Sequence, residues 1–104
     1  MEEERYKLIL TYDIQRGMQE RYYQFIMGQF VPTVQSLGLR FSGAWHTAYG
    51  EYPRRLMEFI ADDFETVEAA IQSEEWAALE ANLHRLVINY RRKVLLFREG
   101  QFQF

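Results

Sequence analysis

The order of strand-like and helix-like patterns is the feature that most restricts what this chain can fold into. Residues 6–13 (YKLILTYD) are rich in β-forming side chains and alternate between two faces, as in a strand. Residues 18–37 place apolar side chains at helical period. The full predicted order is a strand at 6–13, a helix at 18–37, strands at 39–49 and 54–61, a helix from 62 that breaks at 73 and resumes, and a strand at 88–98.

A βαββαβ order of this kind has few ways to fold. With right-handed crossovers it gives a four-stranded antiparallel sheet with strand order 4-1-3-2 and both helices on one face. A chain of 104 residues has the length of one domain. We therefore expect residues 1–104 to form a single α+β domain of ferredoxin-like topology.

Local signals predict where the helices begin and end. Pro32 lies within the first helix and should kink or restart it, and Gly38 should end it. Asp62 and Glu65 have the spacing of a capping box that opens the second helix. Ser73 resembles another N-cap, so this helix should break there and resume. The side chains expected to point inward from its first part are Phe64, Val67, Ala70 and Ile71.

Both faces of the predicted sheet carry apolar side chains. Leu8 and Leu10 point one way while Ile9 points the other, and the third and fourth strands show the same mixture. Two helices can cover only one face, and an exposed apolar sheet face is typical of an interface. We therefore predict a homodimer formed by sheet-to-sheet packing. The alternative is a short sheet whose edges tolerate isolated apolar residues.

The composition excludes several classes of site. The chain has no cysteine, which excludes disulfides and thiol chemistry, and its two histidines make a His-rich metal site improbable. A net charge of -3 argues against nucleic-acid binding. The N-terminus is acidic, unlike a secretory signal, and the uncharged run 22–39 is too polar to span a bilayer. We expect a cytoplasmic protein with no metal, cofactor, nucleic-acid partner or membrane partner.

One end of the predicted sheet collects basic side chains. The first two strands end there and the last two begin there, and the first helix points its N-terminus at the same end. Arginine clusters at such a place favour a carboxylate or a phosphate. The basic residues assigned to this end are Arg16, Arg21, Arg54, Arg55, Arg85, Arg91, Arg92 and Lys93. The alternative is that they are solvated strand ends, with Asp13 paired to one of them.

Aromatic and acid–base candidates fall at the same end. They are Tyr12, His46, Tyr49, Tyr52 and Tyr90, a mixture that suits a small aromatic or acyl carboxylate. His46 is the best candidate for acid–base chemistry, because histidine exchanges protons near neutral pH. Tyr49 or Asp13 within hydrogen-bond reach of His46 would complete a proton-transfer pair. The alternative for His46 is a hydrogen-bonded strand histidine without a catalytic role.

The remaining site residues are expected to bind the substrate. Tyr12 or Tyr49 would donate a hydrogen bond, Trp45 would form a packing wall, and Tyr90 would contribute an aromatic ring. Arg55 or Arg92 would bind the anionic group. For Trp45 the alternative is a core or interface anchor.

Three short segments together resemble a known superfamily. They are residues 11–13 (TYD) ahead of Gly17, residues 43–50 (GAWHTAYG) and residues 73–76 (SEEW). In this order they resemble the dimeric α+β barrel superfamily, and most of all NIPSNAP-like proteins, in which a G-x-W-x-T-x-x-G strand and a late Glu-Trp recur. The resemblance covers nearly the whole chain and implies a dimeric α+β barrel.

The resemblance implies little about chemistry. The superfamily includes cofactor-free monooxygenases, isomerases, cyclases, haem enzymes and many members without known activity, and a fold does not fix a function. Cyclase-like members use a strand histidine with a tyrosine, a part that His46 would take here. The haem-binding members have a helical histidine, but the sequence around His84 lacks their supporting residues.

Three functions therefore remain open. The chain is a cofactor-independent enzyme acting on an aromatic or acyl carboxylate, a non-catalytic module that binds a small anion, or a structural homo-oligomer without a ligand. A ligand screen separates the third from the other two, because ligand binding stabilises the folded state. Replacing His46 by Ala separates the first two.

Overall fold

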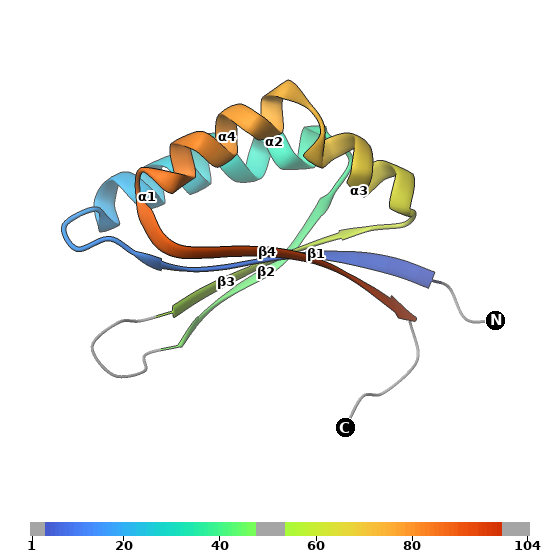
Figure 1. Ribbon diagram of the computed structural model, residues 1–104, viewed down its shortest axis with the longest axis horizontal. Helices are drawn as coiled ribbons and strands as arrows, with labels where there is room; N and C mark the ends of the chain where they lie inside the picture. The colour runs from blue at the N-terminus through green and yellow to red at the C-terminus, as the bar shows by residue number, and fades with distance from the viewer. Residues whose placement is uncertain (1–3, 48–53, 99–104) are drawn as a thin grey trace.

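A four-stranded antiparallel sheet with helices on one face makes up the described part of the chain (Figure 1). The computed structural model describes residues 4–47 and 54–98. The strands are β1 (Glu4–Ile14), β2 (Arg40–Thr47), β3 (Arg54–Ala61) and β4 (Val87–Arg98). Their order across the sheet is β2-β3-β1-β4, which confirms the predicted ferredoxin-like α+β topology. Positions 48 and 49 of the predicted second strand lie outside the described residues.

Five helical segments cover one face of the sheet (Figure 1). They are α1 (Gln19–Phe25), η1 (Ile26–Phe30), α2 (Val31–Ser36), α3 (Phe64–Ile71) and α4 (Glu74–His84). Within the ranges 4–47 and 54–98, none of them is long and apolar enough to cross a membrane.

The first predicted helix restarts at Pro32, as expected. Residues 26–30 form a π-helical turn between α1 and α2, and Pro32 lies at the start of α2. In an α-helix the proline ring clashes with the carbonyl group four residues earlier. The wider π turn directly before Pro32 relieves this clash and lets the helix continue toward Gly38.

Gly38 ends this helix in a Schellman motif. The backbone N–H of Gly38 donates to the carbonyl of Gln35 at 3.0 Å, and that of Leu39 donates to the carbonyl of Val34 at 3.4 Å. Gly38 has φ of +101°, a conformation that glycine adopts without steric cost. The turn leads directly into β2, so it sets where that edge strand begins.

The cap of α3 lies one residue later than predicted. Asp63, and not Asp62, accepts the hydrogen bond from the backbone N–H of Thr66, at 2.7 Å. The carboxylate of Asp62 instead binds the guanidinium of Arg40 at 3.1 Å. Phe64 is also not an inward residue: it is 44% exposed, and its ring lies 5.6 Å from that of Tyr6.

Ser73 caps α4 as predicted. Its hydroxyl accepts the backbone N–H of Trp76 at 3.1 Å and donates to the carbonyl of Ala70 at 2.6 Å. The two helical segments therefore meet at a single side chain. Trp76, Leu79 and Leu83 of α4 are buried against the sheet.

The other face of the sheet carries no helix in the described ranges, and we call it the open face (Figure 1). Leu8 and Leu10 point into the core under the helices, whereas Ile9 points to the open face. At its centre, Glu58 accepts a hydrogen bond from Ser42 at 2.8 Å and pairs with Lys7 at 3.3 Å. The open-face residues include Lys7, Ile9, Thr11, Asp13, Trp45, Arg54, Leu56, Glu58, Ile60, Arg91, Lys93 and Leu95.

The turn at Gly38 provides a stability test. A Cβ at Gly38 would lie 2.9 Å from the Cγ2 methyl of Thr66, whereas a Cβ at Gly17, which also has positive φ (+82°), would meet nothing within 4 Å. Gly17→Ala should cost about 1–2 kcal/mol for the backbone conformation alone. Gly38→Ala should cost more, because the added methyl group also meets Thr66. Combining Gly38→Ala with Thr66→Ser, which removes the Cγ2 methyl, should recover part of that excess. Urea unfolding of the four proteins measures this, and equal losses at the two glycines would contradict it.

Candidate functional site

Two buried tyrosines meet where β1 lies under α1. Tyr12 is fully buried and Tyr22 is 2% exposed, and their hydroxyl groups are hydrogen-bonded to each other. The rings pack edge to face, with centroids 5.7 Å apart. Burial raises the pKa of both side chains above the ordinary value of 10.0. Both therefore remain neutral hydrogen-bonding groups at physiological pH.

Arg55 is the charged group of this cluster. It lies directly opposite Tyr12 in the β1–β3 pairing, and its guanidinium is 5.0 Å from the ring centre of Tyr23 and 5.7 Å from that of Tyr22. Its positive charge partly offsets the rise that burial causes in the pKa of Tyr22. The Nε atom is buried without a hydrogen-bond partner. Among residues 4–47 and 54–98, no carboxylate forms an ion pair with Arg55.

His46 lies beside Arg55 on the next strand. The two residues are direct partners in the β2–β3 pairing, so they share the helix-facing side of the sheet. The imidazole of His46 is exposed. The structure therefore brings together three of the predicted site residues: Tyr12, Arg55 and His46.

Tyr90 and Arg92 also face the helices, but they are occupied by Glu80 of α4. The hydroxyl of Tyr90 donates to Glu80 Oε2 at 2.7 Å, and the guanidinium of Arg92 donates to the same oxygen at 2.9 Å. Burial, followed by the bond to Glu80, raises the pKa of Tyr90. Because Arg92 is already neutralised, Arg55 is the better of the two predicted anion-binding residues.

Asp13 and Trp45 lie on the open face, away from His46. Asp13 is paired with Arg54 at 3.7 Å and accepts a hydrogen bond from Asn89 at 3.0 Å. Trp45 lies opposite Leu56 and folds over Gly43, whose Cβ would lie 3.0 Å from the indole. The sheet thus separates Asp13 from His46, and the expected pair between them does not form. Tyr49, the other predicted partner of His46, lies outside the described residues.

The reason for this separation is the alternation of side chains along a strand. Trp45 and His46 are neighbours in sequence, as are Arg54 and Arg55, and each such pair points to opposite faces. Grouping residues by the end of the sheet at which they lie does not distinguish the faces. The site residues that sequence reasoning missed are Tyr22, Tyr23 and Glu80, which come from the covering helices. Of these three, only Tyr22 could have been found from the sequence, because it belongs to the apolar helical pattern that predicts burial against the sheet.

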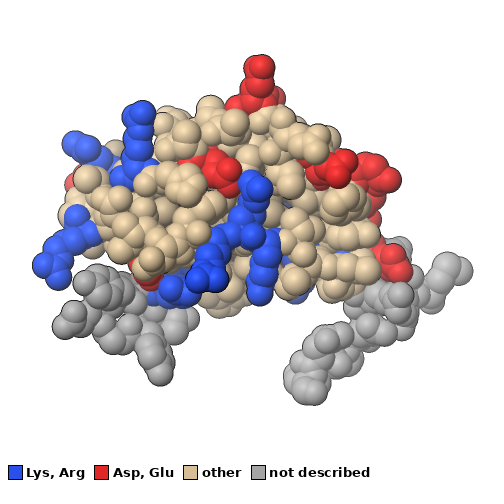
Figure 2. Space-filling view, viewed as in Figure 1, with Lys and Arg blue, Asp and Glu red and all other residues tan. Residues whose placement is uncertain are grey.

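A second group of charges lies on the open face. Ile9, Thr11, Arg54, Arg91 and Lys93 of this face line a depression of about 580 Å³, together with part of Arg92, whose guanidinium binds Glu80 on the helix-facing side. Figure 2 shows Lys and Arg side chains gathered over the left and lower centre of the molecule, with most acidic side chains at the top and right. This distribution agrees with the expected basic end of the sheet. In the ranges 4–47 and 54–98, no group of three or more His, Asp or Glu side chains is placed to hold a metal ion.

Comparison by sequence identifies no relative. The sequence matches no protein-family model, and no curated protein matches it significantly. The fold, in contrast, has many counterparts among solved structures.

Two similar structures are NIPSNAP proteins. The structure of a NIPSNAP family protein of unknown function from Agrobacterium tumefaciens superposes with a TM-score of 0.67 at 12% identity, over 93% of this chain and 91% of the other. An uncharacterized NIPSNAP domain protein from Burkholderia xenovorans gives 0.68 at 14% identity, over 94% and 99%. These similarities confirm the NIPSNAP-like fold expected from the sequence.

Another similar structure bears a different description. It is a putative antibiotic biosynthesis monooxygenase from Nitrosomonas europaea, with a TM-score of 0.63 at 8% identity, over 89% of this chain and 88% of the other. At such identities the likeness concerns the fold alone.

The buried tyrosines predict an alkaline loss of stability. In the unfolded chain tyrosine ionises near pH 10, whereas the raised pKa of Tyr12 keeps it protonated in the folded state. Its stabilisation is therefore complete below pH 10 and is lost as the pH rises further, by about 1.4 kcal/mol per pH unit. Denaturant unfolding from pH 8 to 11 should show a shallower loss for Tyr12→Phe than for the parent. Parallel curves for the two proteins would contradict this.

Proposed function

We propose that this protein binds a small aromatic or acyl carboxylate on the helix-facing side of its sheet. The observation that supports the proposal is Arg55, a cation with a buried, unpartnered Nε and no carboxylate paired with it in the described ranges. A buried polar group without a partner is rare in folded proteins, because it has lost its hydrogen bonds to water and has gained none in return, which costs free energy. A ligand carboxylate supplies the missing acceptor and the missing charge.

The surroundings of Arg55 suit the rest of such a ligand. The ring of Tyr23, which is 45% exposed, has its centre 5.0 Å from the guanidinium and offers apolar surface to an aromatic or acyl group. The hydroxyls of Tyr12 and Tyr22 are buried, neutral and hydrogen-bonded to each other, so they do not compete with the ligand for the charge of Arg55. Arg55 thus binds the anion while Tyr23 contacts the uncharged part.

His46 gives the site its acid–base group. As the direct strand partner of Arg55, it lies next to the place where the carboxylate binds, and its exposed ring can exchange protons with a bound ligand. We propose proton transfer by His46 without a cofactor as the reaction. One protein of the same fold is described as a putative monooxygenase, and two others as uncharacterised or of unknown function.

A non-catalytic binding module is the second candidate. It is supported by the isolation of His46: in the ranges 4–47 and 54–98, no side chain orients the imidazole by a hydrogen bond. Catalytic histidines are usually held in one tautomer by such a partner. Under this alternative the same Arg55 cluster holds the anion and releases it unchanged.

We also propose that two copies of the chain pack through their open faces. Trp45 is 51% exposed and Leu95 is 41% exposed on this face, and Leu56 and Ile60 are only half-buried there. Large apolar side chains in such numbers on one uncovered face support an interface. The helix-facing ligand site remains accessible in this homodimer.

Ligand binding can be tested with a neighbouring control. Benzoate, phenylacetate and butyrate are titrated while the melting temperature of the protein is measured. A ligand at one hundred times its dissociation constant stabilises the folded state by about 2.7 kcal/mol. Arg55→Gln should abolish the shift, whereas Arg54→Gln, with the same change of charge on the opposite face, should keep it. No shift with any probe, or equal loss in both variants, would refute the site.

His46→Ala then distinguishes the two candidates. For any carboxylate that gives a thermal shift, the variant should still bind, because Arg55 carries the anion contact. Product formation, followed by mass spectrometry of the ligand, should cease in the variant. If the parent protein returns every bound carboxylate unchanged, the binding module is the correct function.

Dimerisation has its own test. Sedimentation at micromolar concentration should give a species of twice 12.6 kDa. Leu95→Glu on the open face should produce monomers, because it places a charge in the apolar interface. Met27→Glu is the control, since Met27 is 71% exposed on the helical side. A parent protein that sediments only as a monomer would contradict the proposal.

A further inference from the structure

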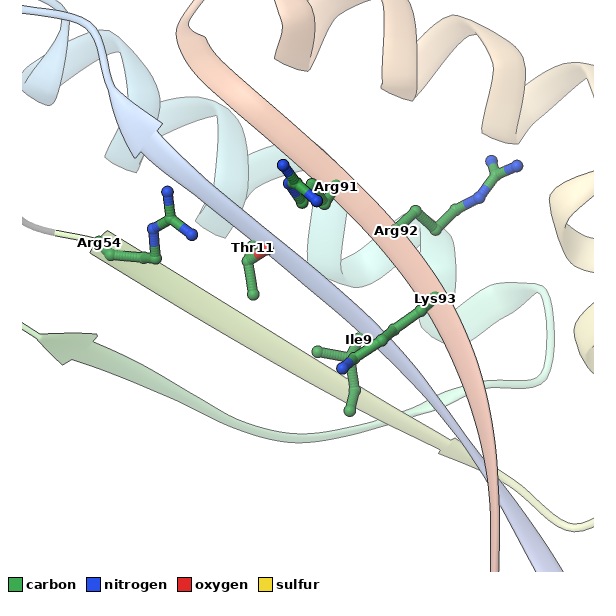
Figure 3. A pocket seen from close by; sticks show the side chains of 6 residues that line it. All are labelled: Ile9, Thr11, Arg54, Arg91, Arg92 and Lys93. Carbon is green, nitrogen blue, oxygen red and sulfur yellow. The ribbon is translucent and has the colours of Figure 1, made fainter.

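The depression on the open face is built by side chains from three strands. Thr11 comes from β1, Arg54 from β3, and Arg91 and Lys93 from β4 (Figure 3). In Figure 3 Lys93 extends toward Ile9, whereas Arg92 points away toward the helices. No acidic side chain is among the residues that line it.

The positive charge of this depression is mostly uncompensated. In the ranges 4–47 and 54–98, Arg91 and Lys93 form no ion pair. Arg54 has Asp13 at 3.7 Å, but that carboxylate is 4% exposed and also accepts the amide of Asn89. Of these three cations, only Arg54 has an acidic partner in the described ranges, and that carboxylate is buried. The excess favours a ligand with more than one negative charge.

The pairing of the strands sets the spacing of these cations. Arg91 lies directly opposite Thr11, and Arg54 directly opposite Asp13, so β3 and β4 flank β1 on both sides. Strands two apart in a sheet are about 9.6 Å from each other, and residues two apart in a strand about 6.6 Å. Lys93 lies opposite Ile9, so Arg91 stands between Lys93 and Arg54 along the depression.

We infer that this depression binds the phosphate group of a small phosphorylated ligand, between Arg54, Arg91 and Lys93. Thr11 also lines the depression, and its hydroxyl can donate to a phosphate oxygen. This site differs in place and charge from the carboxylate site at Arg55, which lies on the other side of the sheet. The two sites are therefore independent.

The phosphate site is compatible with packing of the open faces. Trp45, Leu56 and Ile60 lie on β2 and β3, and the unpaired cations Arg91 and Lys93 lie on β4 next to Leu95, so they border the surface through which two copies would pack. Unneutralised charges are costly to desolvate in an interface. A bound phosphate removes that cost at the place where two copies would meet.

Calorimetric titration with inorganic pyrophosphate tests the inference. At constant ionic strength, Arg91→Gln combined with Lys93→Gln should weaken binding about tenfold or more, since two charge-assisted contacts are lost. The matched control combines Arg16→Gln and Arg21→Gln, which removes the same charge from exposed positions outside the depression. Arg55→Gln should also bind normally, which keeps this site separate from the carboxylate site.

Two results would overturn the phosphate site. One is the absence of heat with millimolar pyrophosphate, and the other is an equal loss of affinity in both double variants, which would indicate general attraction by net charge. Circular dichroism establishes that each variant is folded.

A vesicle sedimentation experiment distinguishes a lipid headgroup from a free phosphorylated molecule as the ligand. Phosphatidylcholine vesicles with and without phosphatidic acid are sedimented with the protein. Retention on the acidic vesicles that depends on Arg91 and Lys93 would identify a lipid headgroup as the ligand. Pyrophosphate binding without retention on the vesicles would identify a free phosphorylated molecule.

Discussion

The hydrogen-bonded pairing of β1 with both β3 and β4 is the constraint on which the rest of the structure depends. It places Arg55 opposite Tyr12 on one face and Arg54 opposite Asp13 on the other, one residue apart. A shift of the register by one residue would exchange the two faces, so that Arg54 would face the helices and Arg55 the open face. The core under the helices and the two charged sites are therefore fixed by the same set of backbone hydrogen bonds.

Charge compensation distinguishes the structural cations from the candidate binding residues. Arg92 is paired with Glu80, Lys7 with Glu58, and Arg40 with Asp62. Arg55 has no such carboxylate in the described ranges, and Arg91 and Lys93 share this lack on the other face. A cation without an internal partner keeps its full attraction for an external anion, whereas a paired one must first lose its partner. This difference separates groups that look alike in the sequence.

Much of the fold could be predicted because local signals agreed with one another. The Schellman turn at Gly38, the restart at Pro32 and the cap at Ser73 all lie where their residue types require. The cap at Asp63 was missed by one residue because Asp62 and Asp63 are equivalent in sequence. Only the sheet decides between them, since Arg40 on β2 binds Asp62.

The sequence by itself determined the order of the elements, the strand topology and the basic end of the sheet, because periodicity, turn residues and charge depend on residues that are close together in the chain. The tertiary structure alone decided which site residues share a face. Neighbours in a strand point to opposite sides, so Trp45 separates from His46 and Arg54 from Arg55. It also decided which cations are neutralised, since Glu80 reaches Arg92 only after α4 packs on β4.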